Sequence, residues 1–90
     1  TDRHVRIRAT RQGVEVTVDP SLPGARIRIQ RRLRERFGWW PSAARPLDYL
    51  SRATFAVRRP ARVRAVLVDA DGWTPVAISP VLTLRPRHRR

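Results

Sequence analysis

The side chains that could carry out chemistry in this chain of 90 residues are few, and none has a catalytic or metal-binding spacing. Asp69, Asp71 and Gly72 share residue types with a calcium loop. Calcium takes about six to eight oxygen ligands, and the further acids of such a loop are absent. We therefore interpret the segment as an acidic turn, in which Asp accepts local hydrogen bonds and Gly adopts a positive φ.

The remaining polar residues do not form a site either. His4 and His88 lie near opposite ends of the chain, and two imidazoles without a third ligand bind zinc poorly. The chain contains no Cys, which excludes disulfides and thiolate chemistry. The carboxylates fall in turns or opposite arginine-rich segments, where salt bridges on a solvated face explain them. We expect no enzyme activity, no cofactor and no metal.

The net charge of +13 predicts attraction to anionic polymers or surfaces, which salt would weaken. All 20 basic residues are Arg, and such a bias is also typical of a GC-rich genome. Basic composition alone carries no information about which anion is bound.

The dominant hydrophobic period is two, which predicts β-strands with one buried and one solvated face. Turn signals rich in Gly, Pro and Asp separate the strands. We expect strands at 4–10, 13–19, 25–32, 37–44, 50–58, 61–69 and 76–84. Gln30 to Phe37 alone has helix-forming composition. Over a single helical turn we favour a third strand that runs through Arg31 or Arg32, followed by an irregular or short strand segment. The fold class is thus all-β, an antiparallel two-sheet sandwich of about seven strands, with one domain at 1–84 and a basic tail at 85–90.

In the last hairpin, alternating apolar residues precede an Asp/Gly loop and a Ser-Pro strand start; the residues are Val63, Ala65, Leu67, Asp69, Gly72, Ser79 and Pro80. This pattern resembles the last hairpin of fibronectin type III and immunoglobulin-like sandwiches. Residues 23–67 resemble the immunoglobulin-like modules of bacterial secreted and cell-surface proteins, so the resemblance spans 5–84. The chain departs from the family at Ala61, where a Tyr is usual. The resemblance implies an extracellular or cell-envelope location and a role in adhesion, spacing or assembly.

The resemblance also implies that the third and sixth strands are neighbours. Arg26 and Arg28 share one face of the third strand, and Arg62 and Arg64 share one face of the sixth. These arginines should therefore lie side by side, which is repulsive unless an acidic group or partner offsets it. Three interpretations remain open: an anion-binding face, a face that docks on an acidic neighbouring domain or subunit, or a solvated face without a partner.

Three tryptophans are the other notable residues. Trp39 and Trp40 are adjacent on a strand, so their side chains point to opposite faces and only one can enter the core. Trp73 lies in the loop before the last strand, where related sandwiches contact partners. Either one Trp fills the core and the others cap its ends, or these residues, together with Asp71, contact a protein partner.

We therefore expect a non-catalytic structural or interaction module of a secreted or surface protein that acts through protein–protein contact or assembly. The alternative is a basic domain that binds nucleic acid or acidic polysaccharide through Arg26, Arg28, Arg62 and Arg64. No apolar run approaches the ~20 residues of a membrane span. The chain begins at Thr1 rather than Met, so we interpret it as a processed chain or an excerpt of a longer one.

Overall fold

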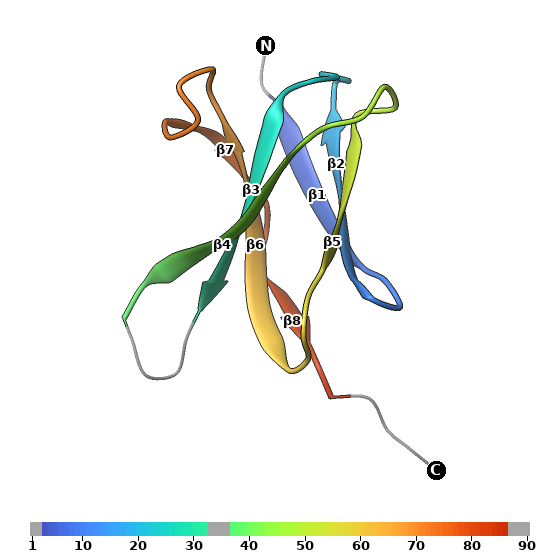
Figure 1. Cartoon of the computed structure of the whole chain (residues 1–90), viewed down its shortest axis with the longest axis vertical. Coiled ribbons are helices and arrows are strands. Elements are labelled where there is room, and N and C mark those ends of the chain that lie inside the picture. The colour runs from blue at the N-terminus through green and yellow to red at the C-terminus, as the bar shows by residue number, and fades with distance from the viewer. Residues whose placement is uncertain (1–2, 33–36, 87–90) are drawn as a thin grey trace.

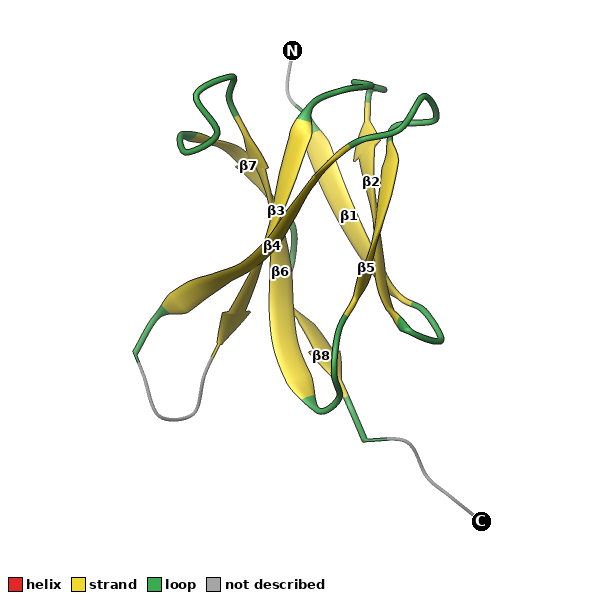
Figure 2. Ribbon diagram, in the orientation of Figure 1, coloured by secondary structure: helices red, strands yellow, loops and turns green. Residues whose placement is uncertain are grey.

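The protein is all-β, as the alternating sequence predicts. A computed structural model describes residues 3–32 and 37–86, and within these ranges no helix is found (Figure 2). The strands are β1 (His4–Ala9), β2 (Gly13–Asp19), β3 (Arg26–Arg32), β4 (Trp39–Pro46), β5 (Arg52–Ala56), β6 (Ala61–Val68), β7 (Pro75–Ile78) and β8 (Leu82–Leu84).

The strands form two antiparallel sheets that pack together in the manner of a β-sandwich (Figure 1). One sheet has three strands in the order β1-β2-β5. The other has five strands in the order β4-β3-β6-β7, and β8 also pairs with β6. The prediction of two antiparallel sheets, with the third and sixth strands adjacent, is therefore confirmed.

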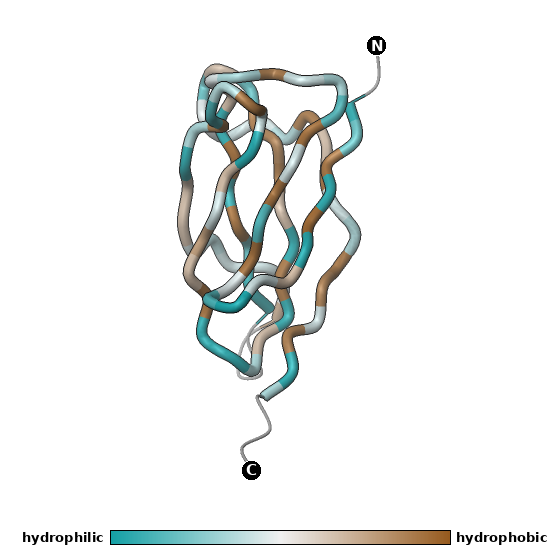
Figure 3. Tube along the Cα trace, turned by 90° about the vertical axis from the view of Figure 1, so that its right-hand side faces the viewer, coloured by the Kyte–Doolittle hydropathy of each residue, from teal (hydrophilic) through white to brown (hydrophobic). Residues whose placement is uncertain are grey.

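The core lies between the sheets and is built by alternation. Figure 3 shows hydrophilic and hydrophobic residues following one another along the strands. Ile27 and Ile29 of β3 face Val63, Ala65 and Leu67 of β6 in this core, and each is at most 1% exposed. The β-branched and aliphatic residues of β1, β2 and β5 complete it from the other sheet. Because the side-chain period is two, the intervening residues of β3 and β6 point away from the core.

The final strand is divided, so the described residues form eight strands, where the sequence predicted about seven. Pro80 lacks a backbone N–H and cannot continue the hydrogen-bond ladder. Ser79 maintains the connection to β6: its N–H donates to the carbonyl of Ala65, and its Oγ accepts the N–H of Ala65, both at 2.8 Å. A buried side chain thus replaces one backbone bond between β7 and β8.

The segment with helix-forming composition is only partly visible. Gln30 to Arg32 continue β3, as the favoured interpretation predicts. Residues 33–36 lie outside the described residues, as do His88 and the end of the basic tail at 87–90.

We predict that Ser79→Ala destabilises the fold by about 1–3 kcal/mol, because it leaves the buried N–H of Ala65 without an acceptor. Ser42→Ala, on the exposed strand β4, is the matched control and should change stability by less than about 0.5 kcal/mol. Urea unfolding of both variants measures the difference, and equal effects would show that the Ser79 bond does not hold the divided strand.

Candidate interaction surface

The outer face of the larger sheet carries the predicted arginines, but the register offsets the two pairs along the sheet, so the prediction that they lie side by side is wrong. β3 and β6 pair antiparallel, with Arg28 opposite Val66, Gln30 opposite Arg64 and Arg32 opposite Arg62. Residues directly opposite each other share a face, and the neighbouring positions form the core. We call the outward-facing set the arginine face; it consists of Arg26, Arg28, Arg32, Arg62 and Arg64. Neither β3 nor β6 contains an Asp or Glu.

Arg28 is held by the loop that joins β6 to β7. Its guanidinium carbon lies 4.7 Å from the ring centroid of Trp73. Its Nη2 donates to the carbonyl of Gly72 at 3.2 Å. The Nε of Arg28 is buried without a hydrogen-bond partner in the described structure. The stacked guanidinium is thus partly desolvated, a setting in which a cation–π contact can contribute about 2 kcal/mol.

Arg64 is held in a similar way further along the sheet. Its guanidinium carbon lies 4.5 Å from the ring centroid of Trp39, at the start of β4. Its Nε donates to Oε1 of Gln30, directly across on β3, at 2.8 Å. An aromatic ring and a neutral amide therefore lie next to Arg64. Gln30 was not among the predicted site residues, although its spacing of two from Arg28 places it on this face.

No tryptophan belongs to the core of the described residues, so the interpretation in which one fills it is wrong. Trp39 lies opposite Arg32 and therefore on the arginine face, while Trp40 lies opposite Arg31 on the other face. The prediction that the two point to opposite faces is consistent with this register. Trp40 is 38% exposed, and its Nε1 donates to the carbonyl of Phe37. The core is closed instead by aliphatic residues and Phe55.

The segment 69–74 is an acidic turn, as interpreted from the sequence. Gly72 has a φ of 78°, and its N–H donates to the carbonyl of Asp69. Oδ1 of Asp71 accepts the backbone N–H groups of Trp73 and Thr74, and its Oδ2 accepts the Thr74 hydroxyl. Both oxygens of Asp71 are therefore engaged within the loop. Its role in the structure is to hold Trp73, and direct contact of Asp71 with a partner stays a prediction.

These hydrogen bonds also set the charge of the loop. The Thr74 hydroxyl, followed by the backbone N–H groups of Thr74 and Trp73, lowers the pKa of Asp71 below its ordinary value. Hydrogen bonds to the ionised form favour that form, and here they outweigh the small opposing effect of desolvation.

Part of the arginine face is apolar, which the sequence analysis missed. Val66 and Val68 lie on the outer side of β6 and are only 2% and 5% exposed. Arg28 and Ile78 flank Val66 in the neighbouring strands, and Val68 lies between Arg26 and Pro75. The signal was the unbroken apolar run at residues 65–68, which is typical of a strand buried on both faces.

Apolar side chains continue from there to the edge of the sheet. Trp73 is 73% exposed, and on β7 Val76 and Ile78 are 56% and 50% exposed. In the sheet order β7 is terminal and pairs with β6. The arginine face thus passes directly into an exposed apolar strip, consisting of Trp73, Pro75, Val76 and Ile78.

The salt bridges expected from the sequence involve few of the described carboxylates. Among the described residues one ion pair is found, between Arg8 Nη2 and Glu15 Oε1 at 2.9 Å on the other sheet. Asp48 instead accepts the backbone N–H groups of Leu50 and Arg52, and Asp71 braces its own loop. Local turn geometry satisfies these carboxylates better than surface arginines do, because backbone donors a few residues away are fixed in place.

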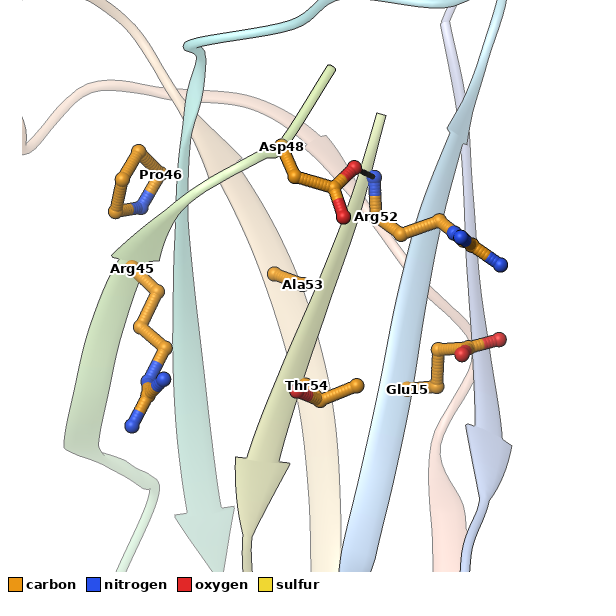
Figure 4. A pocket seen from close by; sticks show the side chains of 7 residues that line it. All are labelled: Glu15, Arg45, Pro46, Asp48, Arg52, Ala53 and Thr54. Carbon is orange, nitrogen blue, oxygen red and sulfur yellow. Dashed lines mark hydrogen bonds between the residues drawn. The ribbon is translucent and has the colours of Figure 1, made fainter. Parts of the chain in front are cut away.

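An open hollow lies beside β4 and β5 (Figure 4). It is lined by Glu15, Arg45, Pro46, Asp48, Arg52, Ala53 and Thr54. Figure 4 shows the side chains of Arg45 and Arg52 extending on opposite sides of Asp48, so the two guanidinium groups do not converge on one ligand. In the described part of the chain, no group of three or more His, Cys, Asp or Glu could hold a metal ion.

Comparison of the chain with protein-family models, curated proteins and solved structures gives no match. Within residues 3–32 and 37–86, no helix is long and apolar enough to cross a membrane.

We predict that the Asp71 carboxyl titrates below the ordinary aspartate value of 3.8. Because its pKa is lower in the folded state, the stabilisation it gives is present above the unfolded-state pKa and is lost as pH falls through the folded-state pKa. NMR titration should show the amide protons of Trp73 and Thr74 shifting with the same midpoint as the carboxyl. These amide shifts should vanish in Asp71→Asn, and a midpoint at or above 3.8 would contradict the assignment.

Proposed function

We propose that this chain is a non-catalytic β-sandwich module of the immunoglobulin or fibronectin III-like type that binds a protein partner. The strand order supports the type: β1, β2 and β5 share one sheet, while β3, β6 and β7 share the other. This agrees with the division of strands A, B and E from strands C, F and G in such sandwiches. The resemblance described above supports an extracellular or cell-envelope location as part of the same proposal.

The observation that carries the proposal is the state of Trp73. The ring is largely exposed, yet it stacks on Arg28 while Asp71 fixes the loop around it. A bulky aromatic that is already ordered loses little conformational entropy on binding. Trp and Arg are also the residues that most often dominate the binding energy of protein interfaces.

The edge strand β7 supports the same surface. Because the N–H of Ser79 donates to Ala65 of β6, the backbone N–H and carbonyl of the preceding Ile78 point the other way, toward the open edge. A strand edge of this kind can pair with an extended segment of a partner. Pro75 and Pro80 flank the edge and limit how far such pairing can extend.

We expect Trp73→Ala to weaken partner binding at least about tenfold, as loss of an interface anchor does. The measurement is selection of displayed protein fragments from the source organism on the immobilised chain, followed by affinity determination for the selected fragments. Tyr49→Ala is the matched control, since Tyr49 is 81% exposed in a distant turn. Equal affinity of the selected fragments for Trp73→Ala and for the unchanged chain would contradict the proposal.

The second candidate function, binding of nucleic acid or acidic polysaccharide, is favoured by one observation. The arginine face carries no acid on its own strands, and Arg26 and Arg62 form no side-chain hydrogen bond or ion pair with the described residues. Their positive charge is therefore available to an anion.

If this second function holds, the chain will be retained on heparin or single-stranded DNA, and retention will fall steeply with added salt. Replacing Arg26 and Arg62 by Ser should lower the salt concentration at which the chain elutes. Elution of the unchanged chain below physiological salt would exclude this function.

A further inference from the structure

We propose that the partner segment is an extended acidic peptide, with Asp or Glu at every second position, that lies across the arginine face. This inference rests on the proposed function and adds the chemistry of the ligand. It uses Arg26 and Arg28 of β3, Arg62 and Arg64 of β6, and the apolar strip beside them.

The spacing of the cations argues for an extended chain. Arg26 and Arg28 are two residues apart on one strand, as are Arg62 and Arg64. A β-strand rises about 3.3 Å per residue, so each pair repeats at roughly 6.6 Å. An extended peptide has the same repeat, and carboxylates at alternate positions can therefore meet these arginines one for one.

The orientation of the cations argues for a ligand that forms directed hydrogen bonds. Arg28 stacks on Trp73 and donates one hydrogen bond to Gly72. Arg64 stacks on Trp39 and donates one hydrogen bond to Gln30. The remaining guanidinium donors are ordered before binding. A planar carboxylate can then accept two parallel N–H groups without the entropy loss that a mobile arginine would incur.

No described carboxylate neutralises the positive charge of the arginine face, which argues for an acidic partner. The described residues offer these guanidinium groups one side-chain acceptor, the neutral amide of Gln30. In the adjoining loop, Asp69 accepts the N–H of Ala70, and Asp71 has both oxygens engaged with Trp73 and Thr74; neither forms an ion pair with a described arginine. Arg32 and Arg62 lie directly opposite each other, and their like charges repel until an external acid binds.

The apolar strip argues for a peptide rather than a uniformly charged polymer. Trp73 and Ile78 lie next to the arginines and are largely exposed. A peptide that alternates acidic and apolar residues can cover both, whereas a sulfated polysaccharide would leave the apolar atoms in water. Single-stranded nucleic acid could stack a base on Trp73, so it is the competing ligand that the experiment must separate.

The test measures binding of a labelled nine-residue peptide in which Glu alternates with Val to the full chain at physiological salt. We expect saturable binding that weakens at least about tenfold when Arg28 and Arg64 are both changed to Gln, the size expected for loss of charge-assisted hydrogen bonds. Changing Arg6 and Arg52 to Gln removes the same charge from the exposed positions of the other sheet and should change affinity less than about twofold.

Three results would overturn the proposal. One is equal affinity for a peptide with the same composition but all Glu residues in one block. Another is tighter binding of oligo-dT than of the alternating peptide. The third is an equal loss of affinity in the Arg6 and Arg52 variant, which would show that binding depends only on the net charge of the chain.

A measurement on the unchanged chain keeps the proposal testable if the double variant does not fold. In NMR, the alternating peptide should shift the side-chain N–H signals of Arg28, Arg64 and Trp73, and shifts confined to other residues would contradict it. A result against the acidic peptide can be distinguished from a result against the proposed protein-binding function. Selected fragments that depend on Trp73 but lack acids would leave the protein-binding role intact and remove only the acidic ligand.

Discussion

The antiparallel pairing of β3 with β6 is the interaction on which the other features of this protein depend. It buries Ile27 and Ile29 against Val63, Ala65 and Leu67, and the same register directs the arginines of both strands to the opposite face. Side chains alternate with a strict period of two, so a slip of one residue would exchange the two sets. Burial of the aliphatic residues therefore fixes the position of the charges, and the core and the arginine face are two results of one register.

That register places the cations of both strands on one face, and aromatic rings and neutral acceptors hold two of them in place. Trp73 and Gly72 hold Arg28, while Trp39 and Gln30 hold Arg64. Each ring presents its negative face to a guanidinium and keeps it in one orientation. Of the four arginines that the sequence analysis predicted for this face, Arg26 and Arg62 make no such contact with the described residues. Two guanidinium groups of this face are thus held in one orientation, and no described acid forms an ion pair with any arginine of the face.

The functional proposal combines this charged surface with an apolar edge. The divided last strand leaves β7 short, with exposed Val76 and Ile78, and the turn before it presents Trp73. Ser79 keeps β7 attached to β6 despite the break at Pro80. A surface with a fixed aromatic, ordered guanidinium groups and an open strand edge has the components of a protein-binding site. Among the described residues, no group of three or more His, Cys, Asp or Glu could hold a metal ion.

The sequence by itself determined the all-β class, most strand positions and the outward direction of the arginines, because a period of two is a local property of the chain. It also indicated the acidic turn, since Asp and Gly act on their immediate neighbours. Tertiary structure alone decided that Trp73 stacks on Arg28 and Trp39 on Arg64. These contacts join residues far apart in the sequence. Their geometry depends on strand order and register, which no local pattern specifies.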